Sequence, residues 1–345
     1  MDRIYLDHAA TTPLLPAAAE AMREGFAIWA NPSSPHAEGR AGRAALELAR
    51  ERVKVALGWN GELVFTSGAS EALALAISRC VLPLAAISAV EHEAVLRHAG
   101  AAEVLGVDTL GLVPAAACAR AGLVAMQKAN NETGVLQPLY AVADAVRSAG
   151  GLLLADDAQG AGKLLTPEAD LVAISAHKFG GPIGIGALLV RDWAMLKPTG
   201  GQERGYRAGT ENLPGALGMA AALEADRGWL VQAVAQRDRL DEAITAAGGE
   251  SLCEATARVP TIASYRMPGV SANAQLIRFD AMGIAVSAGS ACSSGSLRTS
   301  HVLEAMGYAS PGEVVRISIG RETTEAEIDR MIEAWTSVAA GKRAA

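Results

Sequence analysis

Short apolar runs of strand length alternate with helix-like segments between residues 61 and 192, and this alternation constrains the fold more than any other feature. The runs end at turn or polar residues, as strands do. Strands that alternate with helices indicate an α/β fold whose sheet is largely parallel. The predicted strands lie in "GELVFTSG", "LAAISAV", "AGLVAMQ", "GLLLADDAQ", "ADLVAISAHK" and "GIGALLVRD", and the predicted helices in "ASEALALAISRCV" and "YAVADAVRSAG".

Polar side chains gather where these predicted strands end. In parallel α/β sheets the ligand lies beyond the carboxyl ends of the strands. Five strand ends that carry polar groups therefore predict one shared pocket. These groups occupy residues 67–71, 91–92, 130–131, 156–159 and 175–178.

The flanking segments predict further helices and a second, smaller unit. Residues 16–57 read as mostly helical, with a break at "ANPSSPHAEGR", and one long helical stretch is predicted over residues 213–247. A shorter α/β segment follows and ends in "VVRISIGRETTEAEIDRMIEAW", where a threonine cap and early acidic residues start a helix. We expect a large domain over residues 15–230, a small domain over 231–345, and an N-terminal segment, 1–14, that packs with the small domain.

Composition excludes several classes of protein. The net charge of -7 over 345 residues, without a basic cluster, disfavours direct nucleic-acid binding. The longest apolar runs are too short to cross a membrane, and "MDRIYLDHAATTP" lacks the apolar core of a signal peptide, so we expect a cytoplasmic protein that does not bind membranes. The four cysteines form no CxxC pair, so we expect neither a metal site nor a redox dithiol.

Cys292 has unusual surroundings for a cysteine. Cys80 and Cys118 lie in apolar or alanine-rich runs and read as buried, and Cys253 is ambiguous. Cys292 lies in "SAGSACSSGS", whose small residues cannot bury it. An exposed thiol is free to react.

Lys178 and two aspartates follow apolar strands. Lys178, in "SAHKFGGPIGIG", is either a surface lysine or a desolvated Schiff-base lysine, and the glycines would let a ligand approach closely. Asp156 and Asp157 end "LLLADD", and since successive strand residues face opposite sides, at most one points into the pocket. That carboxylate either caps a helix or faces a cation such as a pyridinium nitrogen.

Three further positions allow two interpretations each. "FTSGASEA" is a strand, turn and helix start that could bind phosphate, with a hydroxyl from Ser67 or Ser70, although many α/β turns look alike. His92 is a satisfied core histidine or stacks on a cofactor ring. Arg316, in the apolar "VVRISIG", forms an internal salt bridge or binds a substrate. Five groups are thus available together: a lysine, an aspartate, a turn that could bind phosphate, an arginine and an exposed thiol. The chemistry that uses all five is pyridoxal phosphate chemistry on an amino acid.

Ten ordered blocks along nearly the whole chain carry a family resemblance. They are "YLDHAATTP", "ANPSSPHAEGRAGR", "FTSGASEA", "EHEAVL", "ANNETGVLQP", "DDAQGAGKL", "SAHKFGGPIGIGAL", "GGQERGYRAGTEN", "SAGSACSSGSL" and "VRISIGRETTEAEID". The chain resembles the cysteine desulfurases, within the class V aminotransferase group of fold type I pyridoxal phosphate enzymes. "GSACSSGS" is similar to the branch with a long mobile cysteine loop. The implied fold has a large domain, with a mostly parallel sheet between helices, and a smaller C-terminal α/β domain.

The resemblance implies roles for the cofactor-binding residues. Lys178 would hold pyridoxal 5'-phosphate as a Schiff base, and Asp156 would pair with its ring nitrogen. Gln159 would bind its phenolic oxygen, and His92 would stack on the ring and help in proton transfer. Further residues would hold the phosphate or neighbouring parts of the cofactor, namely Ala69, Ser70, Asn131, Ser175 and His177.

The resemblance also implies the reaction and the assembly. Asn131 and Arg316 would bind the carboxylate of L-cysteine, and Cys292 would take its sulfur as a persulfide, leaving alanine. A sulfur-acceptor or scaffold protein, expected in iron–sulfur cluster assembly, would receive the sulfur. Thr210 would reach the cofactor phosphate of a neighbouring subunit in a homodimer.

Some positions depart from the family pattern, and rival functions stay open. Ser70 stands where the family often has threonine, "EALALAI" lacks an asparagine, and the stretch from His92 to Asn130 is short. None of these removes a catalytic group. The rivals are a selenocysteine lyase, another aminotransferase of this fold, which would have no use for Cys292, and a non-catalytic scaffold, which the presence of Lys178 and Cys292 disfavours.

Overall fold

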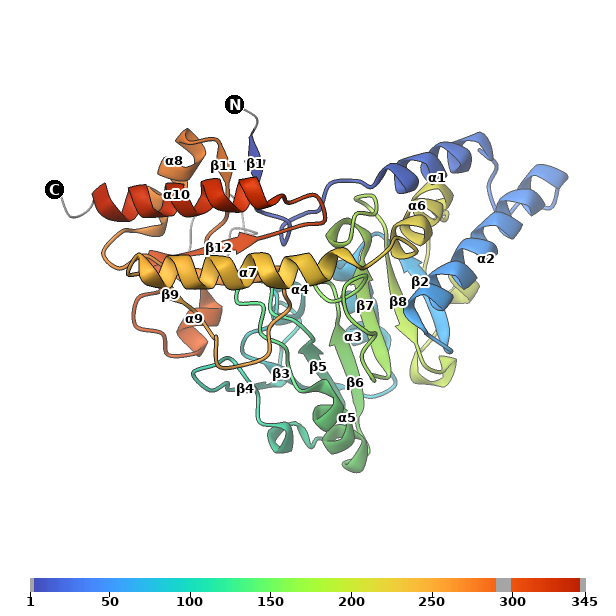
Figure 1. Ribbon diagram of the computed structural model, residues 1–345. Helices are drawn as coiled ribbons and strands as arrows, with labels where there is room; N and C mark the ends of the chain where they lie inside the picture. The colour runs from blue at the N-terminus through green and yellow to red at the C-terminus, as the bar shows by residue number, and fades with distance from the viewer. Residues whose placement is uncertain (1–2, 290–298, 342–345) are drawn as a thin grey trace.

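A layered α/β unit and a smaller C-terminal unit make up the chain (Figure 1). The computed structural model describes residues 3–289 and 299–341. The predicted reactive thiol, Cys292, lies outside the described residues. The fold class predicted from the alternation of strands and helices is confirmed.

The central sheet has the strand order β2-β8-β7-β6-β5-β3-β4. From β7 to β4 each strand runs parallel to its neighbour, and β8 alone in this sheet is antiparallel to both neighbours. The strands β5, β7 and β8 are buried along their whole length, as expected for a sheet covered on both faces. The bounds are β2 (Glu62–Thr66), β3 (Leu84–Ser88), β4 (Glu103–Leu105), β5 (Leu123–Gln127), β6 (Leu152–Asp156), β7 (Leu171–Ser175) and β8 (Gly186–Val190).

Helices cover both faces of this sheet, and each face has its own apolar core. In β2, Leu63 and Phe65 enter one core and Val64 enters the other, because successive side chains point to opposite faces. The first core lies against α1, α2, α5 and α6, and the second against α3 and α4. The bounds are α1 (Pro16–Ala27), α2 (Ala37–Leu57), α3 (Ala69–Arg79), α4 (Glu93–Leu96), α5 (Leu139–Ser148) and α6 (Leu213–Leu223).

The C-terminal unit is built on a small antiparallel sheet in the order β12-β10-β9, and β1 pairs with β11 beside it. The N-terminal Ile4 and Leu6 are buried in the core of this unit together with Trp335. The domain boundaries at residues 14 and 230 stay predictions. The bounds are β1 (Ile4–Tyr5), α7 (Trp229–Ala246), β9 (Glu250–Ser251), β10 (Ile262–Arg266), α8 (Ala272–Ala281), β11 (Ile284–Ala285), α9 (His301–Ala305), β12 (Val314–Ser318) and α10 (Glu325–Gly341).

The prediction of one long helical stretch over residues 213–247 is wrong in its continuity, because the structure has two helices there, α6 and α7. The side chain of Asp226 accepts a hydrogen bond from the backbone N–H of Gly228 (2.9 Å), and Arg227 donates to the carbonyl of Ala56 (3.0 Å). Such side-chain bonds compete with the helical hydrogen bonds. Within the described residues, no helix is both long and apolar enough to span a membrane.

The predicted start of the last helix, α10, is confirmed. The Thr324 hydroxyl accepts a hydrogen bond from the N–H of Glu327 (3.3 Å), and the Glu327 carboxylate accepts one from the N–H of Thr324 (2.8 Å). This reciprocal pair is a capping box, in which two otherwise unpaired backbone donors are satisfied.

Two valines on α2 offer a matched test of its packing. Val53 is fully buried against the central sheet, whereas Val55 is 79% exposed. We expect Val53→Ala to lower the free energy of unfolding by about 2 kcal/mol, because it removes two buried methyl groups and leaves a cavity. The same change at Val55 should alter it by less than about 0.5 kcal/mol. Urea unfolding measures both, and equal losses would contradict the observed orientation of α2.

Candidate active site

A cavity of about 450 Å³ lies at the carboxyl ends of the central strands. The polar groups that follow β2, β3, β5, β6 and β7 contribute to its lining, together with the N-terminal Ala9 and Ala10. The single pocket predicted from the polar strand ends is therefore present. The predicted site residues that line it are Ala69, Ser70, His92, Asn131, Asp156, Gln159, Ser175, His177, Lys178 and Arg316.

Two predicted site residues are not part of this lining. Thr210 lies on an exposed segment after the short turn Glu203–Gly205, so its predicted role depends on a second subunit. Cys292 lies outside the described residues.

The turn between β2 and α3 forms one wall of the cavity. β2 ends at Thr66, and α3 begins at Ala69 and has 11 residues, enough to present a full first turn of N–H groups to the cavity. A Cβ atom on Gly68 would come within 3.5 Å of the Ser175 hydroxyl, so this glycine leaves the space beside Ser175 open. Unpaired N–H groups and the helix dipole at such a position attract an anion.

Lys178 follows β7 in the short helical turn Ala176–Lys178 and reaches the cavity. Its amine donates hydrogen bonds to the backbone carbonyls of Ala9 (2.6 Å) and Ala10 (2.9 Å). Of its two interpretations, the lysine of a ligand site is the one that this partly buried position in the cavity favours. A primary amine held in a cavity is placed to react with a carbonyl ligand.

Asp156 and Asp157 point to opposite sides of β6, as the alternation along a strand predicts. Asp156 lines the cavity, is 7% exposed, and accepts a hydrogen bond from the N–H of Ala158 (2.9 Å). Burial raises its pKa, because the carboxylate loses contact with water, and a cation placed beside it would favour the ionised form again. Asp157 faces away with its carboxylate 3.6 Å from the amine of Lys128, and burial raises its pKa to about 7.

Each of the two histidines that line the cavity has a polar contact through its Nδ1 atom. His92 caps α4, because its Nδ1 accepts a hydrogen bond from the N–H of Ala94 (3.1 Å). His177 Nδ1 lies 3.1 Å from the hydroxyl of Thr11. Burial, followed by the positive charge of Lys178, lowers the pKa of His177 to about 4. His177 is therefore a neutral ring at pH 7.

The first interpretation of Arg316, an internal salt bridge, is confirmed. Its guanidinium lies 2.7 Å from a carboxylate oxygen of Asp7 and donates to the carbonyl of Asn131 (2.8 Å). It also lines the cavity, and its Nε is buried without a hydrogen-bond partner. An internal salt bridge thus holds the arginine at the cavity wall, and its contact with a substrate stays a prediction.

Sequence reasoning missed several residues around the cavity. Asp7 and the carbonyls of Ala9 and Ala10 come from the N-terminal segment "YLDHAATTP", whose charged and polar pattern was the available signal. Lys163 is buried beyond the cavity, donates to the carbonyl of Gln159 (3.2 Å), and has its pKa lowered to about 7 by burial. Glu91 is fully buried, and burial raises its pKa well above the ordinary value.

Comparison with known proteins identifies relatives along the whole chain. The family model described as aminotransferase class-V matches residues 4–331. A cysteine desulfurase from Cereibacter sphaeroides is 37% identical over 96% of this chain and 95% of its own length. A NifS-like protein from Rickettsia africae has a similar structure, with a TM-score of 0.88, 28% identity, and coverage of 97% of this chain and 99% of that one. The structure of SspA in complex with cysteine gives a TM-score of 0.79 at 29% identity, covering 93% of this chain and 100% of that one.

The buried neutral ring of His177 predicts a pH-dependent stability. Its pKa is about 4 in the folded chain and 6.5 in the unfolded chain, so the unfolded state binds a proton first as the pH falls. The free energy of unfolding should therefore decrease between pH 6.5 and pH 4. In His177→Asn this decrease should be smaller, as measured by urea unfolding at pH 7.5 and pH 5. An identical decrease in both proteins would contradict the assignment.

Proposed function

The chain belongs to the class-V aminotransferase family and, within it, to the cysteine desulfurases, and we propose that the cavity is where it takes sulfur from L-cysteine. The observation that carries this proposal is the convergence of Lys178, Asp156 and the α3 turn on one cavity. That convergence supplies an amine, a carboxylate and an anion-binding turn within reach of a single ligand.

The family depends on pyridoxal 5'-phosphate, and the residues present fit this cofactor. A cavity of about 450 Å³ lies in the usual range for small-molecule sites. The buried carboxylate of Asp156 suits a pyridinium nitrogen, and the turn at Ala69 and Ser70, with Ser175 and His177, suits a phosphate. Lys178 would hold the cofactor covalently, Gln159 would bind its phenolic oxygen, and His92 would stack on its ring.

The protein's own residues would orient the substrate and move its protons. Arg316 and Asn131 would bind the carboxylate of L-cysteine, since both residues line the cavity. The bound cofactor supplies an electron sink for the pair released at the substrate Cα. Lys178, whose amine lies in the cavity, would carry the proton from that carbon, and His92 would assist in proton transfer.

Cys292 would complete the reaction as the sulfur acceptor. Its thiolate attacks the substrate sulfur, so that an S–S bond forms and the Cβ–S bond breaks. The electron pair of the broken bond passes to the carbon, which takes a proton and becomes the methyl group of alanine. The persulfide left on Cys292 would then pass sulfur to an acceptor or scaffold protein, in iron–sulfur cluster assembly.

Assembly and location are further parts of the proposal. A homodimer would bring Thr210, exposed in the single chain, to the cofactor phosphate of the partner subunit. The thiols of Cys80, Cys118 and Cys253 are unpaired, as is usual in a reducing compartment, which supports a cytoplasmic location.

Replacing the proposed nucleophile tests the function directly. With L-cysteine and a reductant, we expect the wild-type protein to release alanine and Cys292→Ala to release almost none, because the proposed sulfur acceptor is removed and the thiols of Cys80 and Cys118 are buried. Cys253→Ala is the matched control and should keep its rate, since burial raises the pKa of Cys253 to about 11 and leaves it a neutral thiol. Equal alanine release by wild type and Cys292→Ala would exclude Cys292 as the nucleophile.

Arg316→Ala tests the substrate contact. Loss of a charge-assisted hydrogen bond of about 1.5–3 kcal/mol should raise the KM for L-cysteine roughly tenfold or more. Steady-state alanine release measures this effect. An unchanged KM would show that Arg316 serves only its ion pair with Asp7.

A further inference from the structure

An arginine and a glutamate occupy the outer edge of β2, where a further strand would otherwise pair. β2 is the last strand at its end of the central sheet as far as the chain is described. Arg50 donates a hydrogen bond to the carbonyl of Leu63 (2.7 Å), and Glu203 accepts one from the N–H of Phe65 (2.8 Å). The two side chains therefore satisfy backbone groups that an edge strand leaves open.

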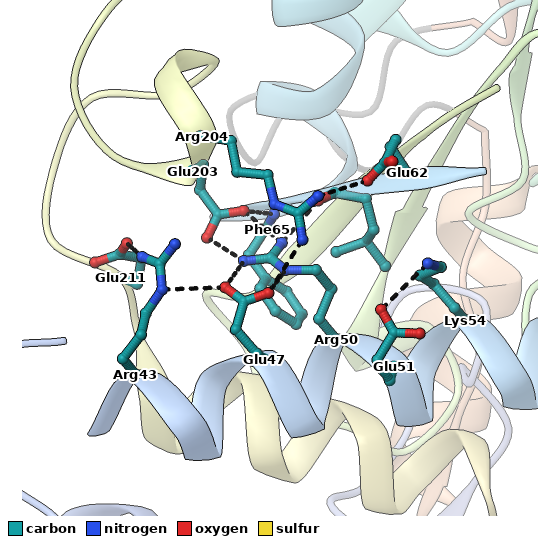
Figure 2. A network of polar contacts seen from close by, with 11 residues as sticks. Arg43, Glu47, Arg50, Glu51, Lys54, Glu62, Phe65, Glu203, Arg204 and Glu211 are labelled. Carbon is teal, nitrogen blue, oxygen red and sulfur yellow. Dashed lines mark hydrogen bonds and ion pairs between the residues drawn. The ribbon is translucent and has the colours of Figure 1, made fainter. Parts of the chain in front are cut away.

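These two side chains form a buried ion pair with two hydrogen bonds (Figure 2). The N···O distances between Arg50 and Glu203 are 2.7 and 3.0 Å, and the two residues are only 1% and 2% exposed. Glu47 accepts a further bond from Arg50 (3.1 Å), whose guanidinium carbon lies 4.9 Å from the centre of the Phe65 ring. A buried pair with this many partners fixes both chain segments, because loss of one partner leaves a buried charge.

The segment that carries Glu203 is held in an unfavourable backbone conformation. Glu203 and Arg204 have φ values of 49° and 56°, in the left-handed region that residues other than glycine seldom adopt. Arg204 also pairs with Glu62 at the start of β2 (2.8 Å) and with Glu47 (3.3 Å) (Figure 2). A conformation of this kind persists only where surrounding contacts enforce it.

The same segment also contacts Glu71, which follows the cavity turn and itself lines the cavity. Arg207 lies 2.7 Å from Glu71 in the first turn of α3, and the other oxygen of Glu71 accepts a hydrogen bond from the N–H of Ser67 (2.5 Å). Burial raises the pKa of Glu71, but the hydrogen bonds from Arg207 and Ser67 outweigh it and lower that pKa. Glu203 thus fixes the strand just before the turn, and Arg207 fixes the helix just after it.

We propose that residues 200–209 brace the turn at residues 67–70, with Glu203 and Arg207 as positioning residues for a bound phosphate that neither of them contacts. This inference rests on the proposed function, in which the phosphate of pyridoxal phosphate binds at that turn. The brace sets the direction of the first N–H groups of α3. Its loss should weaken the hold on a phosphate and leave contacts to the rest of the cofactor unchanged.

Binding of two forms of the cofactor, with and without its phosphate, distinguishes a role in positioning the phosphate site from a role in the general stability of the protein. The full-length protein, freed of cofactor with hydroxylamine, is titrated with pyridoxal phosphate and with pyridoxal, which lacks the phosphate, while absorbance reports binding. We expect Glu203→Gln to weaken pyridoxal phosphate binding about tenfold and pyridoxal binding less than about twofold. Arg207→Gln should act in the same direction, and because the Arg207 side chain is 21% exposed, this variant also tests the brace if Glu203→Gln fails to fold.

Glu224→Gln is the matched control. Glu224 receives two hydrogen bonds from Arg52 (2.8 and 2.7 Å), which lies on α2 like Arg50, but this pair is at the surface and joins α2 to the end of α6. Its substitution should leave both affinities unchanged.

The remaining outcomes separate failure of the brace from failure of the function. Equal weakening of both ligands in Glu203→Gln and Arg207→Gln, or no weakening in either, would overturn the brace. The phosphate-specific loss should also persist in a Thr210→Ala background, and its disappearance there would overturn the brace in favour of an effect through Thr210. A wild-type protein that binds neither form would instead overturn the proposed function.

Discussion

Burial of the central sheet on both faces is the constraint on which the site depends. Parallel strands such as β5, β6 and β7 place their carboxyl ends at one edge of the sheet, and the apolar cores on either side exclude polar groups from the strands themselves. Polar residues therefore lie at the last position of a strand or just after it, where the chain leaves the core. The cavity with Asp156, Ser175 and Lys178 is formed at that edge for this reason.

Charged groups taken from water into this cavity need fixed partners, and the N-terminal segment supplies them. The carbonyls of Ala9 and Ala10 accept hydrogen bonds from the amine of Lys178, and Asp7 pairs with Arg316. Arg316 belongs to β12 of the C-terminal unit, so the ion pair also joins that unit to the cavity. An N-terminal segment buried in the C-terminal core thus orients groups at the end of the central sheet.

The edge of the sheet at β2 presents the opposite problem, since its backbone groups would lack partners. The side chains of Arg50 and Glu203 supply these partners, so the segment at residues 200–209 takes the place of a further strand beside β2. These contacts hold the end of β2 in place. Because β2 leads directly into the cavity turn, they also set the direction in which α3 begins. The desulfurase site therefore rests on contacts well outside its own lining.

The sequence by itself determined six of the seven strands of the central sheet, namely β2, β3, β5, β6, β7 and β8, and the polar residues at their ends. Local apolar patterning was enough for β6 and for the opposite directions of Asp156 and Asp157, and a threonine and a glutamate three residues apart were enough for the start of α10. Tertiary structure alone decided that β8 runs antiparallel, that residues 213–247 form two helices, and that Asp7 pairs with Arg316 and Arg50 with Glu203. The physical reason is separation along the chain. Propensity and capping act over a few residues, whereas Asp7 and Arg316 lie 309 positions apart and meet only once the core of the C-terminal unit has formed.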